Sequence, residues 1–411
     1  MSSQFISDFR IIFTYYILIT TSPINYSHLL ATIYSPTNSN KYVPTFPSRT
    51  KQWLYYFARF LILINFIHVV RLLILNLWEL HVNGQVEMFG LFGLLIWSGA
   101  FTPVVCYDFI FLKPSCLKSL FRSLDTCDKV WNRAKEHLGE KTMSEILFKK
   151  SILVWCLMLH TTAVDFFTIT NCMWSSYQNI ENDPTLLYEA IPWKNQWVDV
   201  VYWFILQILM GSLVMVWSLM LTLPGVVAYN FEYVIRALAK SVEVEPTSKY
   251  PLEAILKDYR LIEFAVRDLH QNGFSKMLLI FFATSGIQQT IESFCIFQMI
   301  KHGASWDEYQ FFLLDLMNTC GRVFHAINAL SRVDQASQIF LNSVRIQMGR
   351  QFNIGHLNEK GFRSRRDPLL KKIRLTKSVL MRMGPLPCKQ NLLLTSGSVH
   401  LNNIVTSALW P

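Results

Sequence analysis

Residues 252–279 have the sequence LEAILKDYRLIEFAVRDLHQNGFSKMLL, in which a charged helical pattern leads directly into an apolar run. The apolar residues of its first part recur at steps of three and four, the spacing of a packed helical seam. They are Leu252, Ile255, Tyr259, Ile262, Val266 and Leu269. Charged residues occupy the other positions, so we expect a helix outside the membrane with one covered face. About two heptads do not decide whether its own chain or a second subunit covers that face.

The apolar run that follows, Met277 to Ile300, is long enough to cross a hydrocarbon core of about 30 Å. The whole chain fits this reading, because its 411 residues are 52% hydrophobic and only 16% charged, against about 25% charged in soluble domains. We therefore predict an all-α polytopic membrane protein with seven transmembrane helices. The predicted spans lie near Trp53 to Trp78, Met88 to Leu112, Ser151 to Trp174, Trp197 to Phe231, Met277 to Ile300, Tyr309 to Leu330 and Asn391 to Pro411.

Three segments of this topology can be interpreted in more than one way. The seventh segment stops before it has clearly crossed, so we interpret it as a truncated span, with an interfacial C-terminal helix as the alternative. The fourth segment exceeds the thickness of the core, so it must tilt, kink at Pro224-Gly225 or continue beyond the bilayer. Near the N-terminus, the apolar run Ile11 to Thr20 has the size of a signal-peptide core but a poor cleavage site.

The distribution of basic residues predicts the orientation. With a cytoplasmic N-terminus, 32 of the 38 lysines and arginines lie on the inner side, as the positive-inside rule requires. We expect a cytoplasmic tail, residues 1–51, and a seven-span domain, residues 52–411. A G-protein-coupled receptor would need the opposite orientation. Nucleic-acid binding is also disfavoured, because the bases are spread over every inner loop and form no single patch.

The sequence contains no motif for enzymatic chemistry. It has no phosphate-binding loop, zinc-binding His-Glu-x-x-His helix, nucleophile elbow or dinucleotide loop. Its eight cysteines include no Cys-x-x-Cys pair. We therefore expect no enzyme activity, no metal and no cofactor.

Three stretches of this chain resemble the arthropod chemoreceptor superfamily, and gustatory receptors most closely. Residues 259–279 are similar to the helix, short Asn-x-Phe turn and fifth span of that family. Residues 329–344 resemble its long sixth helix that runs into the cytoplasm, and residues 394–402 resemble the entry into span seven. The Thr-Tyr and Gln-Phe pairs that mark gustatory receptors late in span seven are missing, because the sequence ends at Trp410-Pro411. Odorant receptors of the same superfamily are therefore the alternative.

The resemblance implies a ligand-gated cation channel in the plasma membrane that detects a small organic tastant. It implies four subunits, identical or mixed, with the seventh spans around a central pore and a ligand pocket in the outer half of the other helices. Since the seventh span is cut short, we expect the 411-residue chain to conduct poorly. The competing function class is a multi-span transporter or scaffold without gated conductance, and the genomic sequence downstream of Pro411 would separate the two.

Polar and aromatic residues in the outer halves of the predicted spans are the candidate ligand contacts, because acids within a span usually face a cavity or a partner. Aromatic faces interleaved with amides and acids suit a small polar organic molecule. The candidates are Asp165, Trp174, Trp203, Gln288, Gln289, Glu292 and Asp315. Alternatively, the acids bond to Arg322, to His160 or to each other, and the aromatics form an interfacial belt.

Membrane lipid is a second expected partner. A basic cluster in the last inner stretch either binds anionic lipid of the inner leaflet or reflects the positive-inside rule alone. It consists of Arg363, Arg365, Arg366, Lys371, Lys372 and Arg374.

Overall fold

The computed structural model of the 411-residue chain describes residues 114–156, 223–244, 250–301, 303 and 306–354. It also describes isolated positions from 49 to 82, positions 159 and 163, and residues 379, 381–383 and 386–387. In this part of the chain, no helix is both long enough and apolar enough to meet the criteria for a membrane span. The predicted tail, apart from Arg49 and Thr50, and the seventh span lie outside the described residues.

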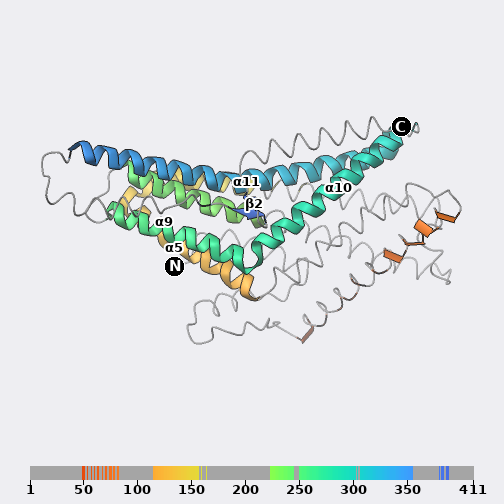
Figure 1. Cartoon of the computed structure of the whole chain (residues 1–411), viewed down its shortest axis with the longest axis horizontal. Coiled ribbons are helices and arrows are strands. Elements are labelled where there is room, and N and C mark those ends of the chain that lie inside the picture. The colour runs from red at the N-terminus through yellow and green to blue at the C-terminus, as the bar shows by residue number, and fades with distance from the viewer. Residues whose placement is uncertain are drawn as a thin grey trace.

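The described chain is helical apart from a small antiparallel hairpin, in which Arg382 pairs with Pro387 and Met383 with Leu386. Two helices without a label in Figure 1 are called helix 140–156 and helix 223–243. The labelled elements are α5 (Pro114–Leu138), α9 (Leu252–Leu269), the π-helical turn η1 (His270–Phe274), α10 (Ser275–Lys301), α11 (Trp306–Ile354), β1 (Arg382–Met383) and β2 (Leu386–Pro387). The all-α prediction is thus confirmed for the described residues, except for two strands of two residues each.

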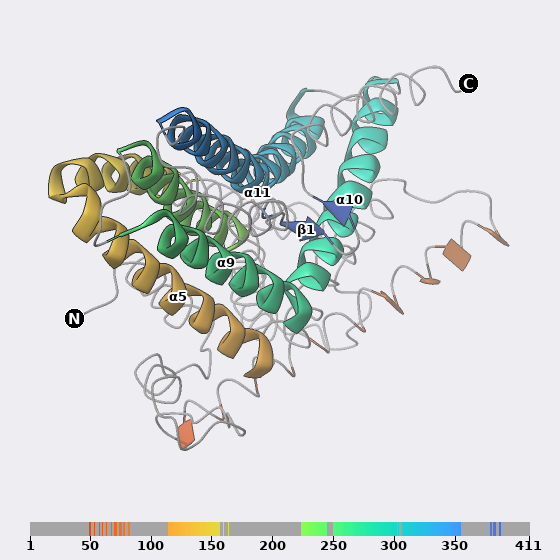
Figure 2. The same ribbon diagram turned by 60° about the vertical axis from the view of Figure 1, so that its left-hand side comes forward.

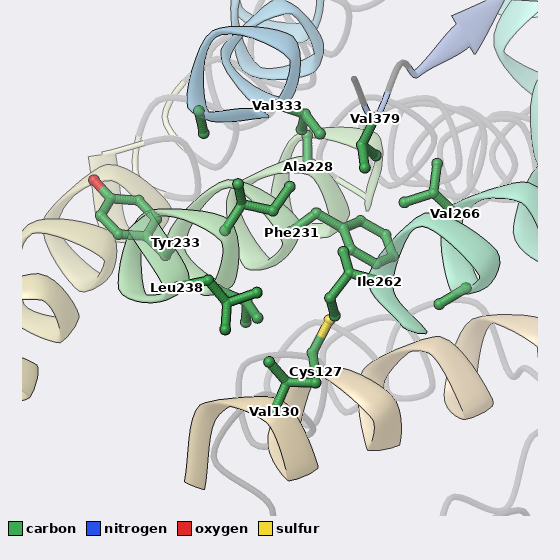
Figure 3. Packing of buried hydrophobic residues seen from close by; sticks show 14 of the residues in the cluster. Cys127, Val130, Ala228, Phe231, Tyr233, Leu238, Ile262, Val266, Val333 and Val379 are labelled. Carbon is green, nitrogen blue, oxygen red and sulfur yellow. The ribbon is translucent and has the colours of Figure 1, made fainter. Parts of the chain in front are cut away.

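The helices α5 and α9, helix 223–243 and the C-terminal half of α11 lie side by side and form a bundle (Figure 1). All apolar residues of the predicted seam on α9 are buried in its core. Cys127 of α5, Phe231 of helix 223–243 and Ile262 of α9 point toward one another there (Figure 3). The Tyr259 ring stacks on the Phe340 ring of α11 at 4.3 Å between centroids. The seam is therefore covered by its own chain, the first of the two partners considered above.

The helix α5 occupies a stretch that we expected only to be an inner loop. Its buried residues Cys116, Leu120, Cys127 and Ala134 recur at steps of four and seven, and this helical periodicity is visible in the sequence. The helix ends at Gly139, where the backbone adopts a φ of 80° and the Gly139 N–H donates to the Lys135 carbonyl at 3.0 Å. Glycine accepts this left-handed conformation without steric cost, and helix 140–156 then begins in a new direction.

A sharp turn at η1 separates α9 from α10. Gly273 has a φ of 117°, Phe274 is fully buried, and the Asn272 side chain donates to the Asp268 carbonyl oxygen at 2.8 Å. The Asn-x-Phe turn expected between the charged helix and the fifth span is confirmed. Because of this turn, α10 leaves the bundle and meets the N-terminal half of α11 at the other end of the molecule (Figure 2).

The 49-residue helix α11 connects the two regions. At 1.5 Å per residue it is about 73 Å long, so one uninterrupted helix packs against α10 at its start and in the bundle at its end (Figure 1). The helix continues well beyond Leu330, as the resemblance to a long sixth helix implies, while the assignment of its first part to span six stays a prediction. Helix 223–243 likewise continues past Phe231, the predicted end of span four.

The pattern of burial reverses at η1. In α9 the apolar seam is buried and the charged residues Glu253, Lys257 and Arg267 are exposed. In α10 the large apolar residues Ile287 and Ile300 are exposed, whereas the polar residues on the opposite side are buried. The α9 pattern is that of a helix in water, whereas α10 exposes large apolar residues and buries polar ones together with apolar residues such as Leu278 and Phe281.

Polar contacts between distant segments hold the bundle together. Arg133 of α5 donates to both carboxylate oxygens of Asp258 on α9, at 2.6 and 2.8 Å, and the Tyr250 hydroxyl donates to the same carboxylate at 2.7 Å. Burial, followed by this bond to Asp258, raises the pKa of Tyr250 above its ordinary value. A planar guanidinium matches a carboxylate in this two-point geometry, which makes the contact specific as well as strong.

A second polar contact in the bundle joins α9 to α11. The Tyr259 hydroxyl bonds with the Ser337 hydroxyl of α11, and the Val379 N–H donates to Ser337 at 2.7 Å. Burial raises the pKa of Tyr259 to about 12. The segment before β1 is thereby attached to both α9 and α11.

Candidate ligand-binding site

A polar cluster lies on the buried face of α10. Ser285, Gln288, Gln289 and Glu292 are spaced at i, i+3, i+4 and i+7 and therefore share one face of the helix. All four are more than nine-tenths buried, and Ser285 and Glu292 are fully buried. Four polar residues at consecutive turns in the interior are unusual, because burying a polar group is costly unless it is hydrogen-bonded.

Asp315 of α11 joins this cluster across the hairpin formed by α10 and α11. Glu292 lies nine residues before the end of α10 at Lys301, and Asp315 lies nine residues after the start of α11 at Trp306, so the two are at the same level. The Gln288 amide nitrogen donates to the Glu292 carboxylate at 2.8 Å and reaches the Asp315 carboxylate at 3.5 Å. One amide group thus bridges two acids from different helices.

Several polar atoms of the cluster have no hydrogen-bond partner among the described residues. The orphaned atoms are Ser285 Oγ, Gln288 Oε1, Gln289 Nε2 and Glu292 Oε2. Each buried polar atom without a partner costs about 1 to 3 kcal/mol. A small molecule with donors and acceptors at matching positions would recover this free energy, so the cluster is suited to binding a polar ligand.

Glu292 has no cationic partner among the described residues, so its burial beside Asp315 favours the neutral carboxyl unless a cation binds. Within the described ranges, Glu292 forms no salt bridge with a lysine, arginine or histidine, and its other carboxyl neighbour is Asp315. Glu232 of helix 223–243 differs in this respect. That fully buried carboxylate accepts from Arg236 at 2.8 Å and from Arg332 of α11 at 3.1 Å. Glu232 is therefore part of a structural ion pair, and Glu292 is of a different kind.

Four of the seven predicted ligand residues, Gln288, Gln289, Glu292 and Asp315, are brought together in this cluster. The other three, Asp165, Trp174 and Trp203, lie outside the described residues, as do His160 and the side chain of Arg322. The alternative in which the acids hold each other has partial support, because Gln288 links the two carboxylates. Ser285 was not among the predicted residues, although its position three residues before Gln288 could have indicated it.

The described part of the chain offers no alternative centre for chemistry. Within it, no group of three or more histidine, cysteine or acidic side chains could hold a metal ion. The thiols of Cys116 and Cys127 are buried in the bundle core, and burial raises the pKa of Cys116 to about 12. A thiol with such a pKa is a poor nucleophile, so these cysteines act as core residues.

The fold identifies the structural class. No protein-family model matches the sequence, and no curated protein matches it. Solved structures do match, and they show that this chain has the fold of an insect olfactory receptor, in agreement with the resemblance in its sequence.

Two of the matching structures are of one receptor. The insect olfactory receptor OR5 from Machilis hrabei superposes with a TM-score of 0.62 at 13% identity, covering 89% of this chain and 91% of that chain. The same receptor in complex with eugenol superposes with a TM-score of 0.64 at 13% identity, covering 96% of this chain and 99% of that chain. The similarity therefore extends over nearly the full length of both chains.

Proposed function

We propose that this protein is a chemosensory receptor of the plasma membrane that acts as a ligand-gated cation channel. The observation that carries the proposal is the buried polar cluster of α10 and α11, inside a hairpin that exposes several large apolar side chains. A site of this kind can recognise a small organic molecule, and the superfamily resemblance supplies the channel activity. The alternative, a transporter or scaffold without gated conductance, has no comparable support.

We assign α10 and α11 to spans five and six. Ile287 and Ile300 of α10 and Met317 and Phe324 of α11 are exposed, and an apolar surface of this extent suits lipid or neighbouring subunits. The charged faces of α5 and α9 suit water. The reversal at η1 falls within a few residues of Met277, where the sequence predicts span five to begin.

The long helix α11 gives the receptor a route from ligand to pore. It carries Asp315 beside the polar cluster and Phe340 in the bundle core, so a shift of its first half is transmitted to the second. Four subunits with a pore lined by the seventh spans are what the resemblance implies, and we retain them as part of the proposal.

The sequence resemblance favours a gustatory receptor, and a tastant is our first choice of ligand. The odorant alternative has equal structural support, because the receptor it matches is an olfactory receptor whose complex contains eugenol. A small organic ligand is common to both.

The test combines the accessibility of tags on intact cells with a measurement of ligand-evoked cation current. Tags at the N-terminus and beside Gly139, an exposed break between helices, should be inaccessible on intact cells, whereas a tag at residues 181–184 should be labelled. Cells that express the receptor from its native gene should show a cation current evoked by sugars, bitter compounds or volatiles. Labelling of the Gly139 tag on intact cells would reverse the topology, and complete absence of evoked current would favour the transporter or scaffold.

A further inference from the structure

We propose that the cluster of Gln288, Gln289, Glu292 and Asp315 recognises a ligand that carries a protonated amine. This inference rests on the proposed ligand-binding role of the cluster and narrows it from small polar molecules to organic ammonium ions. The inference depends on the two acidic side chains of the cluster and on its buried acceptor atoms that have no hydrogen-bond partner among the described residues.

The two acidic side chains of the cluster favour a cationic ligand. Glu292 and Asp315 come from different helices and share one neutral bridging group, the Gln288 amide. Glu292 is fully buried and has no cationic partner among the described residues. Elsewhere in the same chain, the buried Glu232 is neutralised by two arginines. A ligand that brings its own positive charge would do for Glu292 what Arg236 and Arg332 do for Glu232.

The unpartnered acceptor oxygens of the cluster favour a ligand group with several hydrogen-bond donors. Glu292 Oε2 and Gln288 Oε1 are buried acceptors without a partner, and the Ser285 hydroxyl can also accept. A primary ammonium has three N–H donors and no acceptor, so it can bond to several of these oxygens at once. A ligand hydroxyl has one donor and brings no positive charge that would stabilise the ionised form of Glu292.

The surroundings strengthen this preference. Hydrogen bonds between two ionised groups are about twice as strong as those between neutral groups, and a low local dielectric increases the attraction further. For the same reason, an anionic ligand of equal size should be excluded. The Gln289 Nε2 donor remains available for an acceptor elsewhere on the ligand.

The experiment measures binding to the purified full-length chain in lipid nanodiscs at pH 7. The probes are 2-phenylethylamine, which is protonated at this pH, 2-phenylethanol as its neutral counterpart and phenylacetate as the anion. Tryptophan fluorescence or calorimetry reports affinity without requiring a current. We expect the amine to bind about 10- to 100-fold more tightly than the alcohol, the factor for a hydrogen bond to a charged group, and the carboxylate more weakly still.

Variants locate the effect at the cluster. Glu292→Gln keeps the shape of the side chain and should reduce amine affinity about 10-fold or more, while affinity for the alcohol changes by less than about 3-fold. Thr290→Val is the matched control, because Thr290 is exposed on the other side of α10 and bonds only to its own helix at the Gly286 carbonyl. Should Glu292→Gln fail to insert, Asp315→Asn and the comparison of the three probes on the unaltered protein provide the same test.

Equal affinity for amine and alcohol, or no measurable amine binding, overturns the inference. The channel function is judged separately. If the amine binds as expected but evokes no current, the ligand class holds and the channel proposal fails. If a neutral compound evokes a current that Glu292→Gln leaves unchanged, the channel proposal holds and the ammonium inference fails.

Discussion

Loss of the Arg133–Asp258 contact should destabilise the bundle far more than loss of an exposed ion pair. Asp258 is buried, with 5% of its side chain exposed, and binds Arg133 at two points. The substitution Asp258→Asn removes the charge and turns an amide N–H₂ group toward the donors of Arg133 and Tyr250. Hydrogen bonds to a charged group contribute about 1.5 to 3 kcal/mol each.

The expected loss is smaller than the sum of these bonds. Arg133 is 43% exposed, so its guanidinium regains water when the contact breaks, and the amide that replaces the carboxylate keeps one acceptor oxygen. We expect Asp258→Asn to lower the free energy of unfolding by about 2 kcal/mol. The matched control is Asp125→Asn, which breaks the exposed contact between Asp125 and Lys129 on α5 and should cost less than about 0.5 kcal/mol.

Thermal unfolding of the purified receptor, followed by tryptophan fluorescence, measures the difference. A loss of 1 kcal/mol lowers Tm by about 2 to 4 °C in domains of 150–250 residues and by less in longer chains. Asp258→Asn should therefore lower Tm by about 3 °C, and Asp125→Asn by less than about 1 °C. The double substitution Arg133→Met with Asp258→Leu should regain much of the loss, because no buried charge remains without a partner. Equal Tm values for Asp258→Asn and Asp125→Asn would refute the reasoning.

Three further predictions concern other buried groups. Tyr259 ionises near pH 10 in the unfolded chain but has a pKa of about 12 in the folded protein, so its contribution is complete below pH 10 and is lost as the pH rises from 10 through 12. Tyr259→Phe should accordingly flatten the fall of Tm above pH 10, and a fall as steep as in the unaltered protein would contradict this. Both side-chain atoms of the fully buried Asn230 lack partners, so Asn230→Leu should leave Tm unchanged or raise it, whereas a clear decrease would indicate a missed contact. Gly273→Ala forces a side chain onto a φ of 117° and should cost about 1 to 2 kcal/mol, with Gly286→Ala on α10 as the control because a Cβ there meets nothing within 4 Å.

The elements that could be predicted from sequence are those with local signals. The seam of α9, the turn at Asn272 and Gly273, and the limits of α10 all follow from residues within a few turns of one another. The helix α5 also has a periodic pattern of apolar residues. It lies in a strongly charged stretch, which we interpreted only as an inner loop. Short-range pattern is sufficient for such elements, because helix formation and turn geometry depend on neighbouring residues.

The contacts between elements could not be predicted in the same way. Arg133 and Asp258 are 125 residues apart, and nothing in either helix alone selects the other charge as its partner. The pairing depends on how α5 and α9 pack, which is a property of the assembled core. Among the candidate ligand residues, the sequence indicated the acids individually, whereas the bridging role of Gln288 and the contribution of Ser285 required the structure.

The buried acids of the bundle and the buried acid of the α10–α11 hairpin have different surroundings. In the bundle, Asp258 and Glu232 are each bound by arginine, so their burial is compensated and serves to fix how the helices pack. In the hairpin of α10 and α11, Glu292 keeps an unbonded oxygen in a fully buried position. Unlike Asp258 and Glu232, Glu292 has no arginine partner among the described residues, and the proposed ammonium ligand would supply the missing positive charge. The rigid helix α11 carries Asp315 at one end and the bundle contacts at the other, so the binding event and the helix that would respond to it share one structural element.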